Sequence, residues 1–193
     1  MSIIQFNHHI ETIHLADNEI VGVCSDVHGN LPNLLKVIDQ YPTVEKWFCL
    51  GDLVDSLGDR FGYNSQTIEW YNANQDWFKL IIGNHDLYYN NGLQYNCFEQ
   101  LPYAFELIYS DGIKYLAYHS RPDCPVTFTE DTITEREFVD VYDTDDTTGI
   151  LIGHNHKRFS KDFPYTNCKL ISVGNICADL NYIILSKNSY VQY

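Results

Sequence analysis

Aspartate, asparagine and histidine side chains recur in this chain where an apolar run of residues gives way to a loop. These polar groups are Asp26 with His28, Asp52 with Asp55, Asn84 with His85, His119 alone, and His154 with His156. Proteins use carboxylate, amide and imidazole groups of this kind to hold divalent cations. Because loops at the strand ends of one sheet system can converge, we expect these groups to form a single metal-binding site.

The apolar runs that carry these groups predict buried β-strands. We expect strands at residues 20–23, 46–50, 78–82, 113–119 and 149–152. The dipeptide Asp111-Gly112 separates residues 104–109 from residues 113–119. A two-residue Asp-Gly linker between two such runs is a strong signal for a β-hairpin. Each polar group is therefore expected at the end of its own strand.

Helices are expected between the strands, at residues 31–40, 65–73 and 133–142, the last capped by Thr132 or Thr134. Three further strands are expected at residues 170–173, 182–186 and 189–192. The length of 193 residues suits one domain that spans residues 1–193. Within it, residues 3–6 and 11–15 could pair as an N-terminal hairpin extension over residues 1–19.

Composition restricts the partners of the protein. The net charge of -14 argues against stable binding to nucleic acid, which needs a basic surface. No apolar run is long enough to cross a bilayer, and the N-terminus lacks the pattern of a signal peptide, so we expect no membrane partner and a cytoplasmic location. The six cysteines contain no C-x-x-C pair, and we expect all of them to be reduced thiols.

The polar groups form five motifs: D-x-H from Asp26, G-D-x-x-D from Gly51, G-N-H-D from Gly83, the lone His119, and G-H-x-H from Gly153. In this order the motifs resemble the calcineurin-like metallophosphoesterase superfamily, over a region from about Val21 to Ser186. The stretch S-D-V-H-G-N-L-P-N-L-L-K-V-I resembles its small single-domain prokaryotic phosphodiesterases. The resemblance implies an α/β fold, a four-layer α/β/β/α sandwich of two mixed β-sheets flanked by helices, with metal ions at one edge.

The resemblance also implies a centre that binds two divalent metal ions. The ligands implied for the first ion are Asp26, His28, Asp52 and His156. The ligands implied for the second ion are Asp52, Asn84, His119 and His154, so that Asp52 bridges the two ions. Oxygen and imidazole ligands without thiolates suit Mn²⁺, which we expect first, or Fe²⁺, Co²⁺, Ni²⁺ or Zn²⁺.

The reaction implied by the resemblance is attack on phosphorus by a hydroxide that bridges the two metal ions. His85 would contact the phosphoryl group or the leaving group and donate a proton, and Asp55 would orient His85 and favour its protonated form. Asn84, His85 and Arg121 are the expected contacts to the substrate, although Arg121 could equally be a surface residue. Asp86 is expected to anchor the backbone of a nearby loop or a ligand histidine.

Two departures from the family pattern affect the choice of substrate. Ser56 follows Asp55, where Ser/Thr protein phosphatases typically have Arg-Gly, and residues 172–175 read S-V-G-N where relatives often read N-P-G-S. Ser56 argues against a protein phosphatase, and from the resemblance to the small prokaryotic phosphodiesterases we expect a phosphodiesterase that acts on a small phosphorylated or nucleotide-like substrate. The alternatives are a phosphomonoesterase or protein phosphatase, and a non-catalytic scaffold on the same fold. Association of the chain with a second copy is left open.

Overall fold

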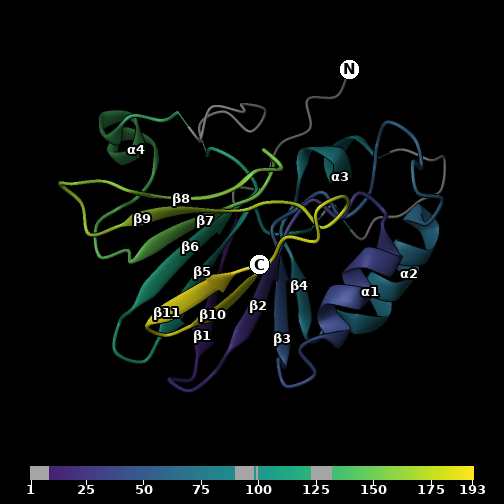
Figure 1. Cartoon of the computed structure of the whole chain (residues 1–193), viewed down its shortest axis with the longest axis horizontal. Coiled ribbons are helices and arrows are strands. Elements are labelled where there is room, and N and C mark those ends of the chain that lie inside the picture. The colour runs from purple at the N-terminus through teal and green to yellow at the C-terminus, as the bar shows by residue number, and fades with distance from the viewer. Residues whose placement is uncertain (1–8, 90–97, 99, 123–131) are drawn as a thin grey trace.

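The computed structural model describes residues 9–89, 98, 100–122 and 132–193. Two mixed β-sheets lie face to face at its centre (Figure 1). The strand order of the first sheet is β1 (Ile10–Leu15), β5 (Ala104–Tyr109), β6 (Lys114–Tyr118), β7 (Gly149–Ile152), β9 (Lys169–Val173) and β8 (Arg158–Asp162). The order of the second is β11 (Ser189–Gln192), β10 (Ile183–Ser186), β2 (Val21–Cys24), β3 (Lys46–Cys49) and β4 (Phe78–Leu80).

Helices cover the outer faces of both sheets (Figure 1). They are α1 (Leu31–Asp39) and α2 (Asn64–Asn74) on the second sheet and α4 (Glu135–Val141) on the first, while the short α3 (Asn84–Tyr88) follows β4 at the edge of the sheets. Phe48 of β3 belongs to the core between the sheets, while its neighbour Trp47 points to the opposite face and packs with α1 and α2. On the far side, Phe138 of α4 packs against the first sheet. The predicted four-layer α/β/β/α sandwich is confirmed.

Side chains cap the first turns of α1 and α4. The Asn30 side chain accepts a hydrogen bond from the backbone N–H of Asn33 (3.3 Å), which satisfies a free donor at the start of α1. Thr134 caps α4: its hydroxyl accepts from the backbone N–H of Glu137 (3.3 Å), and the Glu137 carboxylate accepts from the backbone N–H of Thr134 (2.8 Å). The three predicted helices are confirmed as α1, α2 and α4.

The predicted strands are also present, with shifts of up to two residues at their ends. The hairpin of β5 and β6 is antiparallel, and Gly112 in its turn has a positive φ of 87°, a conformation that glycine adopts readily. Strand β8 and helix α3 were not predicted. The sequence of β8, R-F-S-K-D, has one large apolar residue, because β8 lies at the edge of its sheet and faces solvent along much of its length.

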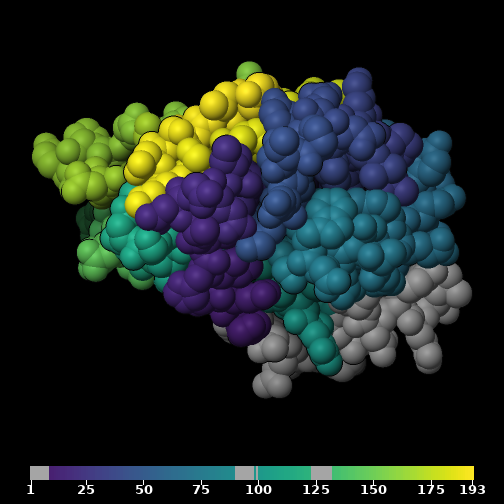
Figure 2. Space-filling view, turned by 90° about the horizontal axis from the view of Figure 1, so that it is seen from below, coloured from purple at the N-terminus to yellow at the C-terminus, as the bar shows by residue number. Residues whose placement is uncertain are grey.

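Strand β1 differs from the expectation of an N-terminal hairpin. It joins the first sheet, where it pairs in parallel with β5. Residues 3–6, the other half of the expected hairpin, lie outside the described residues, as do Cys97 and Cys124. Seen from below, the purple N-terminal segment lies beside the yellow C-terminal segment (Figure 2). Lys187, in the turn between β10 and β11, forms ion pairs with Asp17 (3.1 Å) and Asp111 (2.9 Å).

The direction of the strands determines where the polar loops lie. Strands β2, β3 and β4 are parallel neighbours in the second sheet, and β6 and β7 are parallel neighbours in the first. The carboxyl ends of parallel strands meet at one edge of a sheet, so the loops after these strands share an edge. Of the helices in the described ranges, none combines the length and apolar character that a bilayer crossing requires.

We predict that Phe48→Ala lowers the free energy of unfolding by about 3–5 kcal/mol, because the ring is fully buried between the sheets and packs edge-to-face on Phe105 with ring centroids 5.2 Å apart. Denaturant unfolding followed by circular dichroism would measure the change. The matched control is Tyr165→Ala: Tyr165 is 92% exposed, and its removal should change the same quantity by less than about 0.5 kcal/mol. Equal losses in the two variants would contradict this account of the core.

Candidate metal centre

The first group of predicted ligands gathers where the loops after β2, β3 and β7 meet. Nε2 of His28 lies 3.1 Å from Nε2 of His156, and both nitrogens face Oδ1 of Asp26, at 3.8 Å and 3.2 Å respectively. Oδ2 of Asp52 lies 3.8 Å from the same nitrogen of His28. These four side chains come from distant parts of the sequence, and their donor atoms lie close together in one small volume.

The second group lies beside the first, with which it shares Asp52. Nε2 of His119 lies 3.3 Å from Oδ2 of Asp52, 3.0 Å from Oδ1 of Asn84 and 3.2 Å from Nδ1 of His154. His119, His154 and Asp52 are each at most 5% exposed. By contrast, 43% of the His156 side chain is exposed, so the combined site opens to solvent on the side of the first group.

Asp52 connects the two groups. Its Oδ1 accepts a hydrogen bond from the backbone N–H of His85 (2.7 Å), which fixes the carboxylate. Its Oδ2 lies between His28 of the first group and His119 of the second. The structure thus brings together the seven predicted ligands, and it places Asp52 where a bridging ligand would stand.

The backbone at this site is held in an uncommon conformation. Left-handed φ angles of 47° to 64° occur at Asp26, His28, Asp52, His154 and His156. Such angles at residues other than glycine cost about 1–3 kcal/mol each and persist only where the surroundings enforce them. Hydrogen bonds between the loops supply part of that enforcement, for example from the N–H of Asp26 to the carbonyl of Gly51 (3.1 Å) and from the N–H of His28 to the carbonyl of Asp52 (2.9 Å).

Asp86 anchors the ligand loops, in line with its predicted role. Its Oδ2 accepts hydrogen bonds from the N–H groups of Asp52 (2.8 Å) and Gly83 (3.0 Å), and its Oδ1 accepts from the N–H of Val54 (3.2 Å). The loop after β3 is thereby tied to the loop after β4. Glycine is required at position 83, because a Cβ atom there would collide with the backbone nitrogen and the carboxylate of Asp52.

Other hydrogen bonds orient individual ligands. Nδ1–H of His119 donates to the carbonyl of Leu50 (2.6 Å), which leaves Nε2 to face Asp52 and Asn84. The backbone N–H of His154 donates to Oδ2 of Asp26 (2.9 Å), which leaves Oδ1 to face the first group. Partners of this kind fix the ring or carboxylate so that the remaining donor atom points to a metal ion.

The electrostatics of the site favour a cation. Burial opposes ionisation, but the imidazole of His156 lowers the pKa of Asp26 and that of His119 lowers the pKa of Asp52. Although burial favours its neutral form, the charges of Asp52 and Asp26 raise the pKa of His119 to about 10. Burial and the charge on His119 lower the pKa of His154 to about 4. Protons on the imidazoles thus compensate the two carboxylates in part, and divalent cations can take their place.

His85 and Asp55 lie in contact beside the first group. Nδ1 of His85 is 3.3 Å from Oδ1 of Asp55 and 3.2 Å from the backbone N–H of Ser56, and the His85 ring packs edge-on against His28 with centroids 4.6 Å apart. With its proton on Nδ1, His85 can donate to Asp55. With its proton on Nε2, it can accept from Ser56 instead.

Asn30 and Arg121 are two further polar residues, and the structure shows hydrogen bonds for Asn30 but does not test the substrate contact predicted for Arg121. Asn30 caps α1 and also donates to the carbonyl of Cys177 (2.9 Å). Hydrogen bonds from Thr134, with a smaller contribution from the charge of Arg121, lower the pKa of Glu137 in α4. This relation places Arg121 toward α4, and its contact with a substrate stays a prediction.

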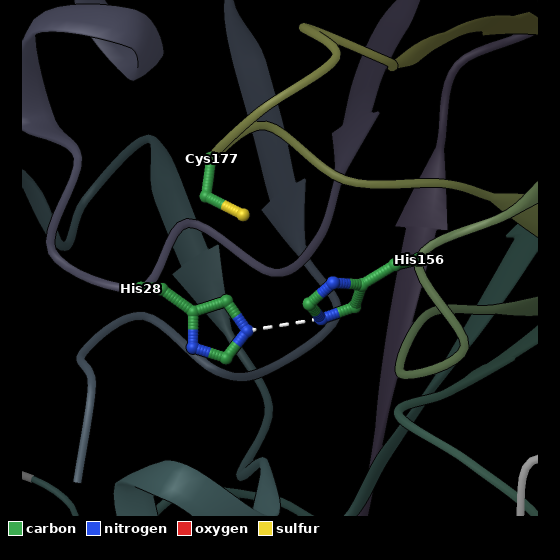
Figure 3. Close-up of side chains that lie close together, drawn as sticks. All are labelled: His28, His156 and Cys177. Atoms are coloured by element: carbon green, nitrogen blue, oxygen red, sulfur yellow. Dashed lines mark hydrogen bonds between the residues drawn. The ribbon is translucent and has the colours of Figure 1, made fainter. Parts of the chain in front are cut away.

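Two residues at the site were missed from the sequence. The sulfur of Cys177 lies with ring nitrogens of His28 and His156 in a group whose donor atoms are all within 4.8 Å of one another (Figure 3). Burial raises the pKa of the Cys177 thiol to about 11. Nε of Arg60 lies 3.6 Å from Oδ2 of Asp55. No signal pointed to Cys177, because a cysteine beside an apolar run is ordinarily a small core residue. The four described cysteines are free thiols.

A pair of divalent cations fits the site as it stands. Oδ1 of Asp26 is a fully buried carboxylate oxygen that accepts no hydrogen bond, although both imidazoles of the first group face it. A buried charged oxygen in that position needs a cation as its partner. The oxygen and imidazole donors also match the ligands of borderline divalent ions.

Comparisons with known proteins agree with the geometry. A family model described as calcineurin-like phosphoesterase matches residues 20–169. A hypothetical protein from Pyrococcus horikoshii OT3 is similar in structure, with a TM-score of 0.66, 14% identity, and coverage of 93% of this chain and 87% of that one. No curated protein matches the chain in sequence.

Two further solved structures are similar. An archaeal phosphodiesterase has a TM-score of 0.57 at 19% identity, with coverage of 90% of this chain and 98% of that one. The phosphoesterase Yfce from E. coli has a TM-score of 0.57 at 16% identity, with coverage of 90% and 98% respectively. At these identities the structural likeness establishes the shared fold alone.

We predict that metal binding competes with a proton on His119. Because the neighbouring carboxylates raise its folded-state pKa above the ordinary 6.5 to about 10, the metal-free protein keeps this proton at neutral pH and loses it as the pH rises through that value. The apparent affinity for Mn²⁺ should therefore rise by up to about tenfold for each pH unit between roughly pH 7 and 9. Calorimetric titrations in buffers of different ionisation enthalpy would count the released protons. His119→Asn should release about one proton fewer, and an unchanged count would contradict the assignment.

Proposed function

The chain belongs to the calcineurin-like phosphoesterase family, a family of metal-dependent phosphoesterases, and on that premise we propose that it hydrolyses a phosphodiester in a small or nucleotide-like substrate. One observation carries the proposal. Oδ2 of Asp52 lies between the imidazoles of His28 and His119, 3.8 Å and 3.3 Å away, so one carboxylate oxygen serves two adjoining groups of ligands. That arrangement suits two neighbouring cations better than one.

The two groups define which residues would hold the cations. One cation would be held by Asp26, His28, Asp52 and His156, and the other by Asp52, Asn84, His119 and His154. When bound, such a pair polarises a phosphoryl group and supplies a water-derived nucleophile at neutral pH. We propose Mn²⁺ as the metal for this donor set, with Fe²⁺, Co²⁺, Ni²⁺ and Zn²⁺ as alternatives.

His85 is the residue that would donate a proton to the leaving group. Its ring is only 18% exposed and lies against His28, next to the first group of ligands. A substrate that binds at this group would therefore place its leaving oxygen near the free edge of the His85 ring. Asp55 lies 3.3 Å from the opposite edge of the ring and orients it, so that His85 would present its free edge as the proton donor.

Asp55 is itself fixed in place. Its backbone N–H donates to Oδ1 of Asn64 (3.0 Å), the side chain of Asn64 donates to its carbonyl (3.0 Å), and its Oδ1 accepts from the N–H of Leu57 (3.1 Å). The orientation of the His85 ring thus depends on the loop before α2. Asp55 is a positioning residue, since it contacts His85 and none of the predicted metal ligands in the distances described.

The charge around the opening supports a diester as substrate. Ser56 stands where a guanidinium would follow Asp55 in Ser/Thr protein phosphatases, and the charge of Arg60 is partly neutralised by Asp55 at 3.6 Å. A phosphodiester carries one negative charge, whereas a phosphomonoester carries about two at neutral pH, so the diester needs less positive charge to bind.

We predict that the metal-loaded protein hydrolyses bis-p-nitrophenyl phosphate faster than p-nitrophenyl phosphate, with Mn²⁺ more effective than Mg²⁺, because the imidazole donors suit the transition metal. Release of p-nitrophenolate, with and without chelator, measures both rates. A preference for the monoester would favour the phosphatase alternative. Silence with every metal would favour a non-catalytic scaffold.

The ligand variant for this assay is His154→Ala, which should reduce turnover by orders of magnitude, because the second cation would lose an imidazole while the fold is retained. His14→Ala is the matched control, since His14 is an exposed histidine on β1, and its activity should equal that of the parent. Near-normal turnover by His154→Ala would refute the assignment of the second group.

We predict that His85→Ala slows hydrolysis of diphenyl phosphate by about 10²–10⁴-fold and that of bis-p-nitrophenyl phosphate far less, because p-nitrophenolate leaves without help from an acid. The ratio of the two rates is the measurement, and each substrate serves as the control for the other. An equal loss on both substrates would show that His85 binds the substrate without donating a proton.

A further inference from the structure

Cys177 is held rigidly beside the first group of ligands. Its backbone N–H donates to the carbonyl of Asp26 (3.1 Å), and its carbonyl accepts from the side-chain amides of Asn30 (2.9 Å) and Asn33 (3.2 Å). The turn that follows β9 is thus fastened at Cys177 to the loop that carries Asp26 and His28. The residue is 4% exposed, so its side chain has little freedom to point elsewhere.

The thiol of Cys177 points toward the two imidazoles of the first group. Figure 3 shows the sulfur of Cys177 turned toward the rings of His28 and His156, whose Nε2 atoms face each other at 3.1 Å. The donor atoms of these three side chains are all within 4.8 Å of one another. Ligands of one cation with metal–nitrogen and metal–sulfur bonds of about 2.1 Å and 2.3 Å lie at most about 4.4 Å apart. The group therefore needs only a small contraction to bind one ion.

An independent observation points to the same place. Oδ1 of Asp26 has no hydrogen bond, its side chain is fully buried, and it lies 3.2 Å from Nε2 of His156 and 3.8 Å from Nε2 of His28. A buried carboxylate oxygen in this state is expected to have a cation as its partner. The two imidazoles thus face the thiol of Cys177 in one group and this oxygen of Asp26 in their own contacts.

The hydrogen bond that the Cys177 thiol makes does not prevent its sulfur from binding a metal ion. The S–H of Cys177 donates to Oδ1 of Asn175 at 3.4 Å. The same oxygen also accepts from the backbone N–H groups of Ala178 (2.8 Å) and Asp179 (3.2 Å). Asn175 would therefore keep two good donors if the thiol lost its proton, and no buried acceptor would be left unsatisfied.

We propose that Cys177 binds the first cation as a thiolate, together with Asp26, His28 and His156, an inference that rests on the proposed two-metal function. On binding, a metal–sulfur bond forms and the thiol proton passes to solvent. A thiolate prefers Zn²⁺, Co²⁺ or Fe²⁺ to Mn²⁺, whereas the second group offers only oxygen and nitrogen donors. The two positions would therefore select different metals, with the softer ion at the first.

The test is titration of the metal-free full-length protein with Co²⁺, followed by absorption spectroscopy. Binding should produce visible d–d bands together with a near-ultraviolet band from charge transfer between thiolate and cobalt. Cys177→Ser should lose the charge-transfer band and keep the d–d bands. Cys168→Ser is the matched control: Cys168 is also a buried free thiol, but it packs in the core beside α4, and this variant should keep both bands.

The outcomes separate this inference from the function on which it rests. If the parent protein shows d–d bands without charge transfer, or if the charge-transfer band survives in Cys177→Ser, thiolate ligation is overturned and the two-metal site stands. If the parent shows no d–d bands at all, both fail. Competition titrations give a second readout, in which Cys177→Ser should lower the affinity for Zn²⁺ by at least about tenfold and that for Mn²⁺ much less. Equal losses for the two metals would also overturn the inference.

Discussion

Asp26 and Asp52 are buried carboxylates in the loops at the edge of the sheets, and the surrounding structure has to compensate their negative charge. An uncompensated ion in a protein interior costs several kcal/mol, so both need positive charge nearby. Protonated imidazoles supply part of it, most clearly at His119, whose pKa the two carboxylates raise to about 10. Divalent cations satisfy the requirement more fully, because they also use the oxygen of Asp26 that accepts no hydrogen bond.

The need to bring ligands around these carboxylates also explains why the backbone at this edge adopts left-handed φ angles, which cost conformational free energy. The left-handed residues occur in the loops that follow β2, β3 and β7, where the chain must turn sharply and still aim a side chain inward. Hydrogen bonds between neighbouring loops and to the buried carboxylate of Asp86 hold the backbone in this strained conformation. Strain of this kind is commonly stored at functional sites, since the site needs a geometry that an unconstrained loop would leave.

The site is asymmetric in its access to solvent. His119 and His154 are almost completely buried, whereas 43% of the His156 side chain is exposed. Solvent therefore reaches the first group of ligands at His156. Cys177 adds a further difference, because its sulfur lies with the open group and a thiolate would change the preference of that position among metals.

The α/β class, nearly all of the strands and the side chains that gather at the edge could be predicted from the amino-acid sequence. Those features depend on local rules: a strand alternates or runs apolar, and each polar group follows directly at its end. The order of the five motifs also led to the family. Short or polar elements such as α3 and β8 were missed, because their local signals are weak and packing against neighbours decides them.

Which side chains are in contact could be learned only from the folded protein. Pairing of β1 with β5 joins residues more than 90 positions apart, and the meeting of Cys177 with His28 and His156 depends on a turn fastened to a distant loop. Nothing in the neighbourhood of Cys177 along the chain distinguishes it from a core cysteine. Contacts of this kind are set by the three-dimensional course of the backbone, which brings together residues whose local sequence contains no information about each other.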